Sequence, residues 1–222
     1  MESDWPTDIQ SATRVQNALR TRVNIVDDFG SVRHIAGVDV SYDLQTNLTR
    51  AFIVVLDADN LKLVTESHAA LPTAFPYVPG FLSFREVPVI IEAFKSLSVR
   101  PDLLMVDGQG IAHPRRFGIA AHLGVLLDLP VIGVAKSRLI GKHEELPMVQ
   151  GSTATLMDKG EHIGTMLRSK AGCNPLFISP GHRVSQISAL NWVLKCLKAY
   201  RLPEQTRLAD RLSKQKETPV LL

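Results

Sequence analysis

Cysteine is scarce in this chain, and long apolar runs are missing. The 222 residues include two cysteines, Cys173 and Cys196, which lie far apart and lack the close spacing of metal-binding cysteines. A disulfide-stapled scaffold is thereby excluded, and a reducing compartment is expected. No apolar run approaches the ~18 residues of a membrane-spanning helix, and residues 1–6 are acidic without an apolar signal core. The sequence predicts a cytoplasmic protein that does not associate with a membrane.

An excess of charge of one sign is also missing. Lysine and arginine number 25 against 22 aspartates and glutamates, a formal net charge of +3. This charge is compatible with a nucleic-acid partner but does not require one, so local patterns have to identify the function. With 45% apolar residues the chain can bury a full core. No repeat or linker interrupts it, and we predict a monomer with a single domain over 1–222 and an ordered core of about 8–212.

The first half of the chain predicts a helix followed by a three-strand meander. Apolar residues recur at helical spacing over 7–23, where Thr7 and Gln10 resemble a capping box. Strands over 35–42, 51–56 and 61–68 are joined by short turns, which favours antiparallel pairing. A loop with three prolines around Tyr77 precedes a helix over 84–97, with Glu86 in its first turn.

The second half has a different pattern. A strand over 103–106, a helix over 117–127 and a strand over 131–135 form a β-α-β unit, which implies parallel pairing. Strand candidates follow over 153–156, 163–167 and 176–179, and then helices over 185–200 and 203–212. Together the two halves predict an α/β fold in which a mixed sheet, an antiparallel meander plus parallel strands, has helices on both faces.

Asp107 ends the buried strand 103–106, where open α/β sheets present their ligands. Gly108 and Gly110 remove side chains beyond it, and His113 and Arg115, with Arg116, add positive charge. An acid flanked by bases suits a metal ion that carries a phosphate. The alternative interpretation is a tight turn followed by a solvated basic start of a helix.

Three further acids lie within or at the start of predicted strands and helices. Asp39 interrupts an apolar strand, Glu86 starts a helix, and Asp210 lies on the last predicted helix. Each alone is more often a cap, an ion pair or a solvated charge. Their order along the chain, however, is the layout of the ribonuclease-H-like fold, in which clustered carboxylates hold metal ions for phosphodiester hydrolysis.

Five local motifs narrow this interpretation. They are Gly37 to Ser41, Pro76 to Glu86, Val106 to Arg115, Gly133 to Ser137 and Asn174 to His182. Together, over about residues 10–212, they resemble endonuclease V, the deoxyinosine-directed repair nuclease family. One departure is visible, because many members of that family have a histidine where this chain has Gln109.

The resemblance implies a metal-dependent endodeoxyribonuclease. It would hydrolyse the second phosphodiester bond 3′ to deoxyinosine and leave 3′-hydroxyl and 5′-phosphate ends. Asp39 and Asp107 are the expected main ligands of Mg²⁺, with Glu86 and Asp210 acting directly or through water, and Mn²⁺ is expected to substitute. Lys136 is the expected catalytic lysine, and its alternative is a surface lysine with an extended stem.

The resemblance also implies a DNA interface. Tyr77 would be the wedge that replaces an extruded base, although a loop anchor is the alternative. Gly80, Gly108, Gly118 and Leu139 would wall the base pocket, and His113 and Arg115 would contact phosphates. Arg85 and Gly110 complete the expected DNA-binding set.

The expected partners are DNA with deoxyinosine or other deaminated or mismatched bases, and inosine-containing RNA. The competing functions are a ribonuclease-H-like junction resolvase or ribonuclease, and a non-catalytic module that binds inosine or RNA.

Overall fold

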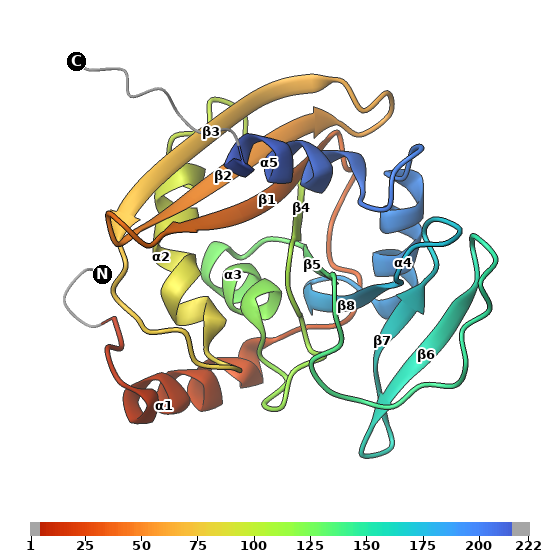
Figure 1. The fold of residues 1–222 in the computed structure, drawn as a ribbon, viewed down its shortest axis with the longest axis horizontal. Coiled ribbons are helices and arrows are strands. Elements are labelled where there is room, and N and C mark those ends of the chain that lie inside the picture. Colours follow the sequence, from red (N-terminus) through yellow and green to blue (C-terminus); the bar gives the residue numbers. More distant parts are fainter. Residues whose placement is uncertain (1–4, 215–222) are drawn as a thin grey trace.

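A single mixed sheet carries all the strands of residues 5–214, the part of the chain that this computed structural model describes. Its eight strands follow the order β3-β2-β1-β4-β5-β8-β7-β6 (Figure 1). The strands are β1 (His34–Asp43), β2 (Leu48–Asp57), β3 (Leu63–Pro72), β4 (Leu103–Val106), β5 (Val131–Ala135), β6 (Thr153–Asp158), β7 (Glu161–Leu167) and β8 (Leu176–His182). The predicted mixed sheet is confirmed.

The centre of the sheet is where its two halves join. Strands β1, β2 and β3 form the predicted antiparallel meander, while β1, β4 and β5 run parallel to one another. Strand β4 is short and wholly buried, and its last residue, Val106, pairs with Val38 in β1. Strand β1 continues past that point, so Asp39 and Asp107 both lie at the end of β4.

Strands β8, β7 and β6 extend the sheet beyond β5 by antiparallel pairing. All three were predicted as strands, although the sequence pattern did not indicate their order in the sheet. These three strands form the part of the sheet that lies beyond β5.

Helices cover both faces of the sheet, as predicted. Helices α2 (Leu82–Lys95) and α3 (Ile119–Leu127) pack on one face, in a core with Ala36 and Val38 of β1. Helices α4 (Gln186–Lys195) and α5 (Glu204–Lys214) pack on the other face, in a core with Ile35 of β1. Because neighbouring strand residues face opposite ways, β1 contributes side chains to both cores.

Helix α5 lies close against β1. A methyl group added at Gly37 would collide with the backbone of Gln205 and Thr206. The absence of a side chain at Gly37 thus allows a helix to approach the strand that carries Asp39, and it brings Asp210 toward that strand.

Several element ends differ from the sequence predictions. Helix α1 (Ile9–Leu19), followed by a short 3₁₀ turn over Arg20–Arg22, is capped by Asp8 and not by Thr7. The Asp8 carboxylate accepts a hydrogen bond from the Ser11 amide at 2.8 Å, which satisfies a free donor of the first turn. Helix α4 ends at Lys195, five residues before the predicted end.

None of the helices within residues 5–214 combines the length and the apolar character that a membrane span requires.

Candidate functional site

Three of the four predicted acids meet at one cavity. Asp39 comes from β1, Asp107 directly follows β4, and Glu86 lies one turn into α2. All three line a cavity of about 230 Å³, whose remaining wall is apolar: Val38, Val40, Leu82 and Val106. We call this the carboxylate cavity. Side chains remote in sequence are brought together because parallel strands present their carboxyl ends at the same edge of the sheet.

Burial and mutual repulsion act on these acids. Burial, together with the charges of Asp107 and Asp39, raises the pKa of Glu86 to about 8. Burial also raises the pKa of Asp39, and the charges of Asp107 and Asp210 raise it further. Among the residues described, no hydrogen bond or ion pair engages the Glu86 carboxylate. Glu86 is therefore mostly protonated near pH 7, and each negative charge placed in the cavity costs free energy.

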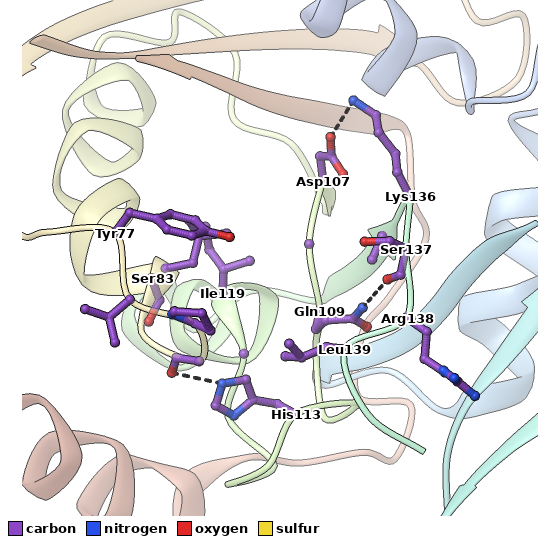
Figure 2. A pocket seen from close by; sticks show the side chains of 17 residues that line it. Tyr77, Ser83, Asp107, Gln109, His113, Ile119, Lys136, Ser137, Arg138 and Leu139 are labelled. Atoms are coloured by element: carbon purple, nitrogen blue, oxygen red, sulfur yellow. Dashed lines mark hydrogen bonds and ion pairs between the residues drawn. The ribbon is translucent and has the colours of Figure 1, made fainter. Parts of the chain in front are cut away.

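Lys136, which follows β5, is the cation nearest to these acids. Its Nζ lies 2.6 Å from Asp107, 2.9 Å from Asp210 and 4.0 Å from Asp39. Burial opposes the charge of this lysine, but the Asp107 carboxylate, helped by Asp210 and Asp39, outweighs burial and raises its pKa. Lys136 is thus charged and tied to the acids, as Figure 2 shows for its contact with Asp107.

Asp210 is joined to the other acids through Lys136. It does not line the carboxylate cavity, and its second oxygen lies 2.6 Å from Lys214. Although burial alone would raise it, the two lysines lower the pKa of Asp210 below its usual value. One turn further along α5, the Ser213 hydroxyl donates to Asp39.

The donor set of the carboxylate cavity suits a hard divalent cation. Carboxylate oxygens are the ligands that Mg²⁺ prefers, and a cation would offset the burial and the repulsion that raise the pKa of Glu86 and Asp39. Within residues 5–214, no three acidic, histidine or cysteine side chains form a ready metal-binding group. A cation of the protein itself, the Lys136 ammonium, lies among the carboxylates. The role of the four acids as metal ligands stays a prediction.

A second cavity adjoins the first and shares Leu82 and Asp107 with it. Its volume is about 260 Å³, and the Tyr77 ring at its rim is 69% exposed. In Figure 2 this ring faces the segment from Ser137 to Leu139 across the cavity. We call it the Tyr77 cavity. Six residues predicted to contact DNA line it: Tyr77, Gly80, Gly108, His113, Gly118 and Leu139.

The other predicted DNA contacts lie outside both cavities. The Arg85 guanidinium stacks 3.8 Å over the ring of Tyr42. A side chain at Gly110 would collide with the Pro180 carbonyl of β8. Gly108 does line the Tyr77 cavity, but a side chain there would collide with that of Ile119. These two glycines therefore serve packing within the protein, whereas the sequence suggested room for a partner. Their contact with DNA stays a prediction.

The basic residues after β4 have partners inside the protein. Arg115 contacts Gln16 and the Gly80 carbonyl, and Arg116 forms ion pairs with Asp158 at 2.8 Å and Glu161 at 2.6 Å. Burial, with the charge of Arg115, lowers the pKa of His113 to about 4. His113 is therefore neutral near pH 7 and supplies hydrogen bonds rather than charge.

Several residues of the site were missed by sequence reasoning. Ser213 follows Asp210 by three positions, so helical spacing would have placed both on one face of α5. The Gln109 amide donates to the Ser137 carbonyl at 2.9 Å and thus connects two walls of the Tyr77 cavity (Figure 2). Gln16 in α1 is fully buried and bonds to the Gly80 carbonyl, and no sequence signal linked it to the site.

Comparison with known proteins places this geometry in context. The family model described as Endonuclease V matches residues 17–211. The chain is 51% identical over 211 residues to the endonuclease V of Rippkaea orientalis. The matched region covers 95% of this chain and 92% of that relative. The crystal structure of endonuclease V from Streptomyces avermitilis is similar with a TM-score of 0.90 at 42% identity, covering 96% of this chain and 95% of that one.

A nucleic-acid complex is also among the similar structures. It is the crystal structure of Ciona intestinalis endonuclease V in complex with a 24mer DNA containing an inosine followed by a ribo-adenosine. It has a TM-score of 0.79 at 28% identity and covers 93% of this chain and 96% of that chain.

Proposed function

Since the chain belongs to the endonuclease V family and is a nuclease that acts on DNA, we propose that it nicks DNA containing deoxyinosine in a metal-dependent reaction. The proposed cut is at the second phosphodiester bond 3′ to the lesion and leaves 3′-hydroxyl and 5′-phosphate ends. The single observation that carries the proposal is the convergence of Asp39, Glu86 and Asp107 on one cavity that adjoins a second, the Tyr77 cavity.

Mg²⁺ is the proposed cofactor, with Mn²⁺ able to replace it. Asp39 and Asp107 would hold the ion, and Glu86 and Asp210 would bind it directly or through water. Such an ion, when bound, activates water and stabilises the charge that develops on the phosphate and the leaving oxygen.

Lys136 is the proposed catalytic lysine. Its charge lies 2.6 Å from Asp107 and within 4.0 Å of Asp39, so it sits where an anionic phosphate would approach the carboxylates. A point charge held in place there stabilises the extra negative charge of the transition state. Its contact with Asp210 on α5 holds the ammonium in position.

The Tyr77 cavity is the proposed site for an extruded base. Tyr77 is an exposed aromatic between Pro76 and Pro79, and it would fill the gap that the base leaves in the duplex. Hypoxanthine differs from adenine by an oxygen acceptor and a ring N–H donor, which backbone amides and carbonyls can distinguish. Asp107, shared by both cavities, would bring the recognised nucleotide close to the carboxylates.

We propose that the protein acts as a single-domain monomer. The Ciona complex supports DNA with inosine as the partner, and the ribonucleotide in that DNA makes inosine-containing RNA a second substrate to test. DNA with other deaminated or mismatched bases belongs to the same proposed class.

A nicking assay tests the proposal. Labelled duplexes with and without one inosine are incubated with the protein and Mg²⁺, Mn²⁺ or a chelator, and the products are sized on a denaturing gel. We expect metal-dependent nicking at the second phosphodiester bond 3′ to inosine. Inosine-containing RNA, branched DNA and an RNA/DNA hybrid are run in parallel. Preference for branched DNA or the hybrid, or binding without turnover, would contradict the proposal.

A further inference from the structure

We propose that Gln16 of α1 is a positioning residue that fixes the Tyr77 loop, residues 73–81, so that Tyr77 can act on paired DNA. The inference rests on the proposed function and deepens it. It assigns a role in substrate selection to a helix that contributes no side chain to either cavity.

Three side chains converge on one backbone oxygen of this loop. The Gly80 carbonyl accepts hydrogen bonds from Gln16 Nε2 at 3.0 Å, His113 Nε2 at 3.0 Å and Arg115 Nη2 at 2.8 Å. Figure 2 shows the bond from His113. A carbonyl oxygen has two lone pairs, which the three donors must share, so the oxygen is saturated and is held from three directions.

Gln16 connects the members of this group. Its Oε1 accepts a hydrogen bond from Arg115 Nε, while its Nε2 also points to the Phe117 carbonyl at 3.5 Å. The Arg115 guanidinium in turn stacks 4.3 Å over the Phe81 ring. Gln16 is fully buried, so losing these bonds would leave polar groups unsatisfied away from water.

The bonds also determine the state of His113. Its Nδ1 accepts from the Arg115 amide at 3.2 Å, so the proton is on Nε2, which donates to Gly80. This neutral tautomer agrees with the lowered pKa of about 4. The carbonyl therefore keeps its three donors throughout the neutral pH range.

The rest of the loop packs on the same helix. Phe75 and Phe81 lie in one apolar cluster with Ala12 of α1, and Val78 packs against that cluster. Ala12 and Gln16 are one helical turn apart, so one face of α1 supports the loop on both sides of Tyr77. Gly80 has φ of +81°, a conformation that other residues rarely adopt, which sharpens the turn after Tyr77.

The role of the loop depends on the substrate. A wedge is needed only where the base must be separated from a partner strand, whereas inosine in a single strand is already unpaired. A displaced Tyr77 should therefore impair nicking of a duplex much more than nicking of a single strand. A defect of the fold or of the metal site would impair both.

The experiment compares these two substrates with purified full-length protein. We expect Gln16→Met to lower the ratio of kcat/KM for duplex over single-stranded inosine DNA by about tenfold, as a small misplacement of a positioning group does. Tyr77→Ala should lower the same ratio, and combining the two should add little. Gln10→Met, the same change at an exposed position of α1, is the matched control and should leave the ratio unchanged.

A second variant separates positioning from folding. Gln16→Glu keeps the size of the side chain and its acceptor for Arg115, but it replaces the donor to Gly80 with an oxygen. We expect it to fold, with a lower melting temperature than wild type, and still to lower the ratio. An unchanged ratio, an equal loss on both substrates, or failure of both variants to fold would overturn the inference. Wild-type protein that nicks neither substrate would overturn the proposed function as well.

Discussion

Asp39 and Asp107 reach the carboxylate cavity from two neighbouring parallel strands. Asp39 is 8% exposed and is held by the Ser213 hydroxyl, and Asp107 contacts Lys136. Neither side chain lies in the Tyr77 loop, so their removal should affect the chemistry more than the binding of DNA.

We therefore predict that Asp39→Ala or Asp107→Ala lowers nicking by a factor on the order of 10³, because a lost carboxylate removes metal-dependent charge stabilisation. Affinity for inosine-containing duplex, measured by fluorescence anisotropy, should change little. Asp59→Ala is the control, since Asp59 is 92% exposed and pairs only with Lys195 among the described residues. Normal nicking by either variant in Mg²⁺ would refute the assignment.

Lys136 competes with a divalent ion for the same carboxylates. Its ammonium lies within 4.0 Å of three of them. Removing the ammonium leaves the metal ion as the main cation that can neutralise these carboxylates. We predict that Lys136→Met lowers nicking while it tightens Mn²⁺ binding about tenfold, a change of about 1.4 kcal/mol.

Isothermal titration of the apoprotein with Mn²⁺ measures this effect. Lys214→Met is the matched variant, because within residues 5–214 Lys214 pairs only with Asp210 and its side chain is 71% exposed. It should alter Mn²⁺ affinity much less than Lys136→Met does. Weaker Mn²⁺ binding by Lys136→Met would mean that the lysine organises the ligands rather than competing with the ion.

The residue types of the site were more predictable than their contacts. A buried aspartate inside an apolar strand, such as Asp39, costs free energy unless it is paired or bound to a cation. An aspartate at such a position therefore indicated a functional site in the sequence. Gln16 gave no such signal, because a glutamine on the buried face of a helix can satisfy its amide in many ways. The partners of Lys136 were equally hidden, since they depend on where α5 crosses the sheet.

At the scale of elements, local pattern predicted most helices and strands but not their neighbours. The β-α-β unit and the meander follow from periodicity and short turns. The order β5-β8-β7-β6 does not, because antiparallel strands can be added at any free edge. The close approach of α5 to Gly37, which brings Asp210 to Lys136, is likewise a result of tertiary packing.

Helix α3 carries a buried histidine that should make the fold sensitive to acid. His122 is fully buried, stacks on Trp5 and bonds to the Ser83 hydroxyl at 3.1 Å. Burial lowers its pKa from 6.5 to about 3, so between these values the unfolded chain binds more protons than the folded one. The stability linked to His122 is therefore complete above pH 6.5 and is lost as the pH falls toward 3.

We predict that His122→Phe, which keeps an aromatic ring at this place, reduces the loss of stability with acid. The slope of the free energy of unfolding against pH should fall by up to about 1.4 kcal/mol per pH unit below 6.5. Urea unfolding at several pH values between 4.5 and 7.5 measures it. His162→Phe, at an exposed position of β7, should leave the slope as in wild type. Equal slopes for wild type and His122→Phe would rule out this contribution.

For the whole molecule, the charges in the carboxylate cavity lower the free energy of unfolding. Asp39, and above about pH 8 Glu86 as well, hold negative charge where burial and neighbouring carboxylates disfavour it. Binding of a cation to the folded state alone should therefore stabilise the protein as a whole.

We predict that Mn²⁺ raises the melting temperature of the wild-type protein. In chelator at pH 9, where Glu86 is ionised, the double variant Asp39→Asn with Glu86→Gln should melt about 4 °C higher than wild type, because the repulsion is removed at a gain of about 1–2 kcal/mol. It should also lose its response to Mn²⁺. Differential scanning calorimetry with and without Mn²⁺ provides both values, and a lower melting temperature for the variant in chelator would contradict the prediction.

Asp107 and Leu82 belong to the walls of both cavities. A small molecule that fills the space beside Tyr77 would consequently contact two side chains that also line the compartment of Asp39 and Glu86. A chelating group attached on that side would engage the two compartments together, which offers a starting point for inhibitor design.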